Sequence, residues 1–162
     1  MAEEEAEVLK IKSDALRLLS FRPRSEEELR QRLKLKKHPA PLIDEVIGTF
    51  KRQGVLDDTK FAKLFAESRV YSRPAGKKNL ELDLKKKGIP QALVQETLAG
   101  LKDYDEKKIA KDLVFKRYQK MTGIPRERKK ARLFGFLKRR GFGNDVIFSV
   151  LSDLFSEVSS EE

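Results

Sequence analysis

The sequence of 162 residues contains no cysteine, no tryptophan and a single histidine, His38. Without cysteine the chain can form neither a disulfide nor a thiolate metal site, which fits a reducing compartment, and we expect a cytoplasmic protein. His38 stands beside Pro39 in a predicted turn, so we expect it to be a solvated loop residue and not a catalytic group or metal ligand. We therefore predict no metal site and no cofactor.

Long apolar runs and nucleotide-binding loops are also missing. The N-terminus has no apolar run of signal-peptide length, and nowhere are there the ~18 consecutive apolar residues that span a bilayer. Neither G-x-x-x-x-G-K-[ST] nor G-x-G-x-x-G occurs. The adjacent carboxylates Asp57 and Asp58 are better explained as capping residues at a helix start than as an acid-base pair. The sequence thus predicts a protein that is not an enzyme.

Charge is abundant and unbalanced. The chain has 36 Lys and Arg against 26 Asp and Glu, a formal net charge of +10, although both ends are acidic. Such an excess favours polyanions or acidic protein surfaces as partners. The alternative is that net charge serves only solubility.

One sequence pattern occurs three times. Residues 33–50 read LKLKKHPAPLIDEVIGTF, residues 84–101 read LKKKGIPQALVQETLAGL and residues 137–154 read LKRRGFGNDVIFSVLSDL. The copies are offset by 51 and 53 residues and carry apolar residues in the same slots. Apolar spacings of three and four on either side of a breaker predict two helices joined by a tight turn. Gly88 and Gly141 suit the left-handed residue that ends a helix.

A further apolar stripe precedes each pair of helices, and strand signals are absent. We therefore predict an all-α fold of nine helices in three tandem three-helix repeats that form an elongated curved array. The predicted parts are an acidic flexible N-terminus at 1–8, repeats at 9–55, 56–102 and 103–155, and a flexible acidic C-terminus at 156–162. Ser25 and Glu28 have capping-box spacing, and Asp57 or Asp58 can cap the helix that follows.

Basic residues recur at the end of the first helix of each copy, and a denser run occupies 126–140. The alternative for these side chains is that they only complement the negative ends of helix dipoles. For the run at 126–140, a binding site for a polyanion or an acidic partner is the better explanation. The predicted contact surface consists of Lys77, Lys78, Lys85, Lys86, Lys87, Arg126, Arg128, Lys129, Lys130, Arg132, Lys138, Arg139 and Arg140.

The sequence resembles the RecX family of bacterial recombination regulators over residues 11–155. The strings that carry the likeness are ALRLLSFRPRSEEELRQRL from Ala15, GVLDDTKFA from Gly54 and GKKNLELDLKKKGI from Gly76, together with LKRRGFGNDVIFSVL from Leu137. The residues of this family signature, which we expect to be mainly structural, are Gly54, Leu56, Asp57, Asp58, Phe61, Ala62, Arg69, Gly88 and Gly141.

The resemblance implies a fold of three tandem three-helix repeats and a non-enzymatic regulator of the recombinase RecA. Members of this family bind the RecA filament on single-stranded DNA in its helical groove and inhibit strand exchange, ATP hydrolysis and the co-protease activity that triggers the SOS response. For this chain we accordingly expect RecA as the partner, weak binding of single- or double-stranded DNA, no membrane association and a monomer. The competing hypothesis is a helix-turn-helix-like DNA-binding protein that acts independently of RecA.

The chain departs from the family pattern at two turns. Lys37-His38 stands where the other copies have Gly88-Ile89 and Gly141-Phe142, so we expect the first turn to be built differently, with Pro39 and Pro41. Before the second helix of the middle repeat, Lys77-Lys78 replaces the paired arginines often found in the family. Lysine keeps the charge there but loses the bidentate fork of arginine.

Overall fold

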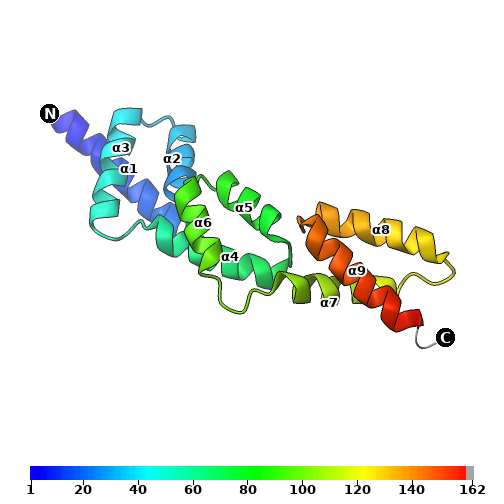
Figure 1. The fold of residues 1–162 in the computed structure, drawn as a ribbon. Helices are drawn as coiled ribbons and strands as arrows, with labels where there is room; N and C mark the ends of the chain where they lie inside the picture. Colours follow the sequence, from blue (N-terminus) through cyan, green and yellow to red (C-terminus); the bar gives the residue numbers. More distant parts are fainter. Residues whose placement is uncertain (160–162) are drawn as a thin grey trace. The chain divides into compact units, whose positions relative to one another are not determined.

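The computed structural model describes residues 1–159, and over these residues the chain forms nine α-helices and no strand (Figure 1). In chain order they are α1 (Ala2–Phe21), α2 (Glu26–Leu35), α3 (Ala40–Arg52), α4 (Asp58–Ser72), α5 (Lys77–Lys86), α6 (Gln91–Ala99), α7 (Glu106–Tyr118), α8 (Arg126–Arg139) and α9 (Asn144–Ser159). The predicted all-α fold of three tandem three-helix repeats is confirmed.

The helices gather into two compact units. The first comprises Met1–Phe65 and Leu84–Thr97, and the second comprises Ala66–Asp83 and the chain from Leu98 onward. In the first unit α1, α2 and α3 pack on a core that includes Ile11, Leu33 and Ile43. In the second unit α7, α8 and α9 pack on a core that includes Leu137 and Ile147. Both cores include side chains from the repeated apolar slots.

The predicted flexible N-terminus is wrong, because α1 begins at Ala2. Glu3, Glu4 and Glu5 lie in the first turn of this helix, where carboxylates interact favourably with the positive end of the dipole. At the other end of the chain, α9 continues to Ser159, so residues 156–159 are helical as well. The rest of the predicted flexible C-terminus, residues 160–162, lies outside the described residues.

The expectation that the first turn is built differently is also wrong. Lys37 adopts a φ of 65°, against 77° for Gly88 and 86° for Gly141. In each turn the amide of this residue donates to the carbonyl oxygen of the residue three positions earlier, and the amide of the next residue donates to the carbonyl oxygen five positions before it. The three turns therefore share one backbone design, and a lysine occupies the left-handed position where the sequence suggested that only glycine would serve.

His38 is not a solvated residue. Its side chain is only 3% exposed, with Nδ1 2.7 Å from a carboxylate oxygen of Glu7 and Nε2 2.8 Å from one of Asp14. His38 ties the α2–α3 turn to α1, and neighbouring residues do not reveal such a long-range contact.

Helix starts follow the predicted capping. The Ser25 hydroxyl accepts from the Glu28 amide at 3.1 Å, and the Ser25 amide donates to the Glu28 carboxylate, which completes the capping box. Asp57 caps α4 by accepting from the amides of Thr59 and Lys60 at 3.0 and 3.1 Å. Asp58 instead accepts from the Glu26 amide at 2.8 Å and joins the start of α4 to the start of α2.

Candidate functional site

Two joints of the same design hold successive repeats together. In each, the start of the second helix of one repeat lies against the left-handed turn of the next repeat. In the first joint, the Ser25 hydroxyl donates to the Lys87 carbonyl oxygen at 2.5 Å, and both residues belong to the first unit. In the second joint, the Gly76 amide donates to the Arg140 carbonyl oxygen at 2.9 Å, and both residues belong to the second unit.

The glycines are required at the joints because the backbones approach so closely. A Cβ on Gly88 would overlap the side chain of Glu27, and one on Gly141 would lie 2.6 Å from atoms of Asn79. A Cβ on Gly76 would overlap the backbone at Gly141. Lys37 is exposed, so a side chain is tolerated there.

Charge is neutralised at the first joint. The first turn of α2 carries Glu26, Glu27 and Glu28, and the Glu28 carboxylate lies 2.7 Å from Lys87 Nζ and 3.0 Å from Arg22. Burial by itself would raise the pKa of Glu28, but the hydrogen bonds from Arg22 and Lys87 outweigh it and lower the pKa to about 2. Lys87, which we predicted as a contact residue, is therefore engaged within the fold.

The second joint carries an excess of positive charge. The first turn of α5 has no acidic residue and begins with Lys77 and Lys78, which are exposed. The Asn79 side chain donates to the Arg139 carbonyl oxygen at 2.9 Å, so the start of α5 lies against the basic end of α8. The structure thus brings two of the predicted basic groups together, Lys77 and Lys78 with Lys138, Arg139 and Arg140.

Arg140 lies at the centre of this concentration of positive charge. Burial, and then the charges of Arg73, Arg69 and Arg117, lower the pKa of Arg140. Its guanidinium donates to the Pro74 carbonyl oxygen at 3.1 Å, and both it and the Arg117 guanidinium lie over the ring of Phe136, at 5.4 and 4.6 Å from the centroid.

The sequence does not indicate Arg73 and Arg117 as members of this group. Arg73 lies between α4 and α5 and Arg117 lies on α7, outside the positions at which basic residues recur in the repeats. Both side chains are exposed. Arg69, which we expected to be structural, donates to Asp83 at 2.8 Å and also to the Arg73 carbonyl oxygen. Only the assembled fold shows that these side chains surround Arg140.

The basic residues at the starts of α5 and α8 do not stabilise these helices through the helix dipole. Lysines near the end of a helix complement its dipole, whereas Lys77 and Lys78 occupy the first turn of α5, where a cation is unfavourable by about 0.3–1 kcal/mol. The same holds for Arg126, Arg128 and Lys129 in the first turn of α8. The dipole explanation fits Lys85, Lys86, Lys138 and Arg139, which stand in last turns.

The basic side chains of α8 divide by role. Arg128, Arg132 and Arg139 are exposed, and their spacing of four and seven residues puts them on one helical face. Arg126 donates to Ser159 and the Phe155 carbonyl oxygen, and Lys129 lies 4.6 Å over the ring of Tyr118. Lys130 interacts with Glu127 at 3.4 Å. Lys138 donates to Asn144 at 2.5 Å.

The signature residues lie in the frame of the fold. Leu56, Phe61 and Ala62 are buried, and Gly54 adopts a left-handed φ of 70° just after α3. In the described part of the chain, no group of three or more His, Asp or Glu side chains could hold a metal ion. Within residues 1–159, no helix is long and apolar enough to cross a membrane.

Comparison with known proteins agrees with the repeat organisation. Models of the first, second and third three-helix domains of RecX match residues 12–49, 57–98 and 104–151. The chain belongs to the RecX family. Regulatory protein RecX from Streptomyces coelicolor is 30% identical over 142 residues, which cover 88% of this chain and 76% of that protein. The Chlorobium phaeobacteroides protein of the same name is 32% identical over 141 residues, covering 87% and 91%.

Solved RecX structures share the fold. The crystal structure of RecX from Lactobacillus salivarius aligns with a TM-score of 0.83 at 21% identity and covers 95% of this chain and 98% of that one. A second RecX structure aligns with the same score and covers 91% and 73%. The RecX fold of nine helices therefore positions the cluster around Arg140, which we call the basic joint: Arg73, Lys77, Lys78, Arg117, Arg139 and Arg140.

Proposed function

We propose that this chain is a non-enzymatic negative regulator of the recombinase RecA. It binds the RecA filament on single-stranded DNA, lies in the helical groove of that filament, and inhibits strand exchange, ATP hydrolysis and co-protease activity. It would thereby act in homologous recombination, DNA repair and control of the SOS response. Membership of the RecX family supports this proposal, and the observation that carries it is the concentration of positive charge at the basic joint.

The contrast between the two joints gives that observation its weight. The joints stand at equivalent places of successive repeats, so the fold itself does not require net charge of either sign at this place. One joint opposes Glu26, Glu27 and Glu28 to lysines, and the other adds Lys77 and Lys78 to arginines. A cluster in which cations outnumber carboxylates, with Glu106 accepting from the Lys77 amide at 3.0 Å, is suited to the phosphates of a nucleic acid or to an acidic protein surface.

The competing hypothesis, a helix-turn-helix protein that reads duplex DNA, has less support in the helices that follow the turns. In such motifs the helix after the turn enters the major groove and contacts bases. Here α6 carries neither lysine nor arginine, and α9 carries Asp145, Asp153 and Glu157 with no basic residue. Helices of this composition are poorly suited to lie between two rows of phosphates.

The test is to add the protein to RecA preassembled on single-stranded DNA and to follow ATP turnover and strand exchange. We expect the wild-type chain to inhibit both, and the Lys77→Ser/Lys78→Ser variant to inhibit less. Lys60→Ser/Lys63→Ser is the matched control, because it removes the same charge from exposed positions of α4. Absence of inhibition by the wild type at a few molecules per filament turn would refute the proposal. Tight, sequence-dependent duplex binding without RecA would favour the competing hypothesis.

A further inference from the structure

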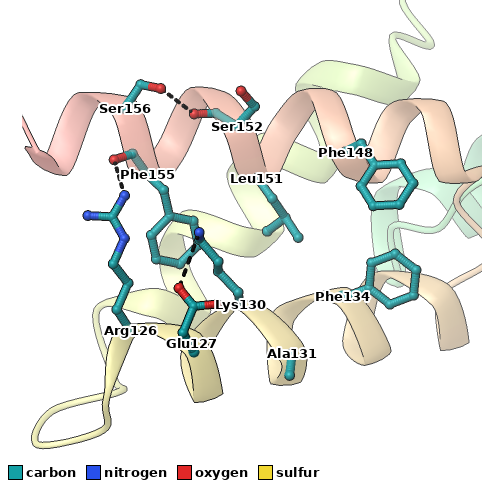
Figure 2. A pocket seen from close by; sticks show the side chains of 10 residues that line it. All are labelled: Arg126, Glu127, Lys130, Ala131, Phe134, Phe148, Leu151, Ser152, Phe155 and Ser156. Atoms are coloured by element: carbon teal, nitrogen blue, oxygen red, sulfur yellow. Dashed lines mark hydrogen bonds and ion pairs between the residues drawn. The ribbon is translucent and has the colours of Figure 1, made fainter.

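A groove lies between α8 and α9, away from the basic joint. It has a volume of about 570 Å³, and Figure 2 shows its two ends. At one end Phe134 of α8 and Phe148 of α9 point toward each other, with ring centroids 5.6 Å apart. At the other end lie Arg126, Glu127 and Lys130. Between these ends the lining is mostly apolar.

The first repeat shows what the fold needs at these positions. In the repeat alignment, Phe134 and Phe148 take the places of Arg30 and Asp44, which form an ion pair at 3.1 Å between α2 and α3. Likewise, Lys130 and Phe155 take the places of Glu26 and Lys51, which pair at 2.9 Å. The same helix pair is thus bridged by surface ion pairs in one repeat and lined by aromatic rings in another.

The aromatic pair is therefore not demanded by the three-helix fold. Phe148 is 61% exposed, whereas the ring of Phe155 is buried and serves the core. An ion pair at the positions of Phe134 and Phe148 keeps a repeat folded and its surface polar, as Arg30 and Asp44 do. An exposed Phe148 beside the half-buried Phe134, in a concave and partly apolar surface, is instead typical of a site that a partner covers.

The lining also favours one kind of occupant. A groove between two helices with an apolar floor fits the apolar face of a third helix, with an anchoring side chain at the exposed aromatic end. The far end carries Arg126 and Lys130, and α8 presents a single acidic residue in its first turn, Glu127. An occupant with carboxylates beside its apolar face would match this charge.

A nucleic acid fits the groove less well. A single strand needs cations along its path as well as rings for stacking. Here the cations stand at one end of the groove only.

We propose that the α8–α9 groove binds an acidic amphipathic helix of a protein partner, with a large apolar side chain seated against Phe134 and Phe148 and carboxylates near Arg126 and Lys130. In the setting of the proposed function, on which this choice of partner rests, the helix belongs to the recombinase, and the groove makes the protein contact while the basic joint makes the polyanion contact.

The experiment uses the first repeat as its template. Phe134→Arg/Phe148→Asp transfers the Arg30–Asp44 pair to the third repeat, so we expect the variant to fold and melt as the wild type does. Binding of purified RecA in the absence of DNA is measured for both chains. The variant should bind about tenfold more weakly or worse, equivalent to about 1.4 kcal/mol, because the apolar anchor point is lost. Phe148→Leu, which keeps an apolar surface, should retain most of the affinity, and single-stranded DNA binding should be unchanged.

Each other outcome has a definite meaning. If the double variant binds RecA as well as the wild type does, the groove is not the docking site. Loss of single-stranded DNA binding alone would assign the groove to nucleic acid, and a wild-type dimer that the double variant abolishes in sedimentation would assign it to a second copy of the chain; both overturn the proposal. Failure of the wild type to bind either free RecA or the RecA filament on single-stranded DNA would refute the proposed function first. Should the double variant not fold, Phe148→Ser serves in its place.

Discussion

At the scale of single residues, one backbone position has three occupants with different surroundings. Lys37, Gly88 and Gly141 all adopt left-handed conformations at the end of a helix. Glycine is favoured there for its conformational freedom, yet only two of the three positions use it. The difference lies in what faces the position, because Gly88 meets Glu27 and Gly141 meets Asn79 across a joint, whereas the side chain of Lys37 is exposed.

Substitutions at these three positions should therefore change the free energy of unfolding by unequal amounts. Gly88→Ala and Gly141→Ala should each lower the free energy of unfolding by about 2 kcal/mol or more, because the alanine has to adopt a left-handed backbone conformation and its Cβ overlaps a neighbouring repeat. Lys37→Gly should not destabilise, since relief of a left-handed lysine, about 1 kcal/mol, offsets the added freedom of the unfolded chain. Urea unfolding of the three variants measures the difference. Equal costs for Gly141→Ala and a control Gly54→Ala, where a Cβ meets no neighbour, would contradict the close-approach explanation.

His38 shows a second effect at this scale. It is buried between Glu7 and Asp14, and the hydrogen bonds from Lys36 and His38 hold the pKa of Asp14 below its ordinary value. His38→Ala should lower the free energy of unfolding by about 2 kcal/mol, because two carboxylates lose a buried donor. Amide hydrogen exchange should become faster in the first half of α1. Unchanged exchange there would mean that α1 is held by apolar packing alone.

At the scale of helices, the start of α5 places two lysines against the positive end of a helix dipole. Lys77→Ser/Lys78→Ser should raise the melting temperature slightly, by the equivalent of about 0.5 kcal/mol, while it weakens inhibition of RecA. Binding and stability then change in opposite directions, which a merely structural role for the lysines would not produce. Circular dichroism melting and ATP turnover on filaments measure the two effects. A variant that is less stable than the wild type would contradict this view of the helix start.

The first joint, between α2 and the turn after α5, makes stability depend on pH. The pKa of Glu28 is lowered from 4.5 to about 2, so the folded state resists protonation of this group more than the unfolded chain does. Its stabilisation is present above pH about 4.5 and is lost as the pH falls toward about 2. Glu28→Gln should accordingly be less stable than the wild type near neutral pH, and the difference should shrink in that acidic window. A difference that stays constant over the window would show that the ion pairs with Arg22 and Lys87 contribute little.

The helices themselves could be predicted from the sequence, because apolar spacing and capping residues are local signals. Ser25, Glu28 and Asp57 were identified as caps for that reason. The burial of His38 and the assembly of Arg73 and Arg117 around Arg140 could not be predicted, because each depends on contacts between residues far apart in the chain. The sequence predicts the triplet at 85–87 as part of a contact surface with the others, whereas Lys87 is held by Glu28.

At the scale of the whole molecule, the formal net charge of +10 attracts polyanions wherever it is placed, so the contribution of particular sites must be separated from general attraction. Arg128, Arg132 and Arg139 share one face of α8, and the face ends at the basic joint, where Asn79 contacts Arg139. A row of this kind spans about 16 Å along the helix at about 1.5 Å per residue, enough to contact several phosphates of one strand. Site-specific contact and general attraction predict different dependences on salt.

Reversal of this row provides the test. Arg128→Glu/Arg132→Glu/Arg139→Glu and a control, Lys34→Glu/Lys60→Glu/Lys63→Glu, each contain three reversals that change the charge by two apiece, so both lower the net charge from +10 to +4. If three phosphates are contacted along α8, the slope of log affinity for single-stranded DNA against log salt should flatten by about 2 in the first variant, since each contact contributes about 0.7. The control should bind more weakly at low salt but keep nearly the wild-type slope, because long-range attraction is screened without the release of bound counterions. Equal slopes for the two variants would mean that the net charge alone, and not the row on α8, holds the strand.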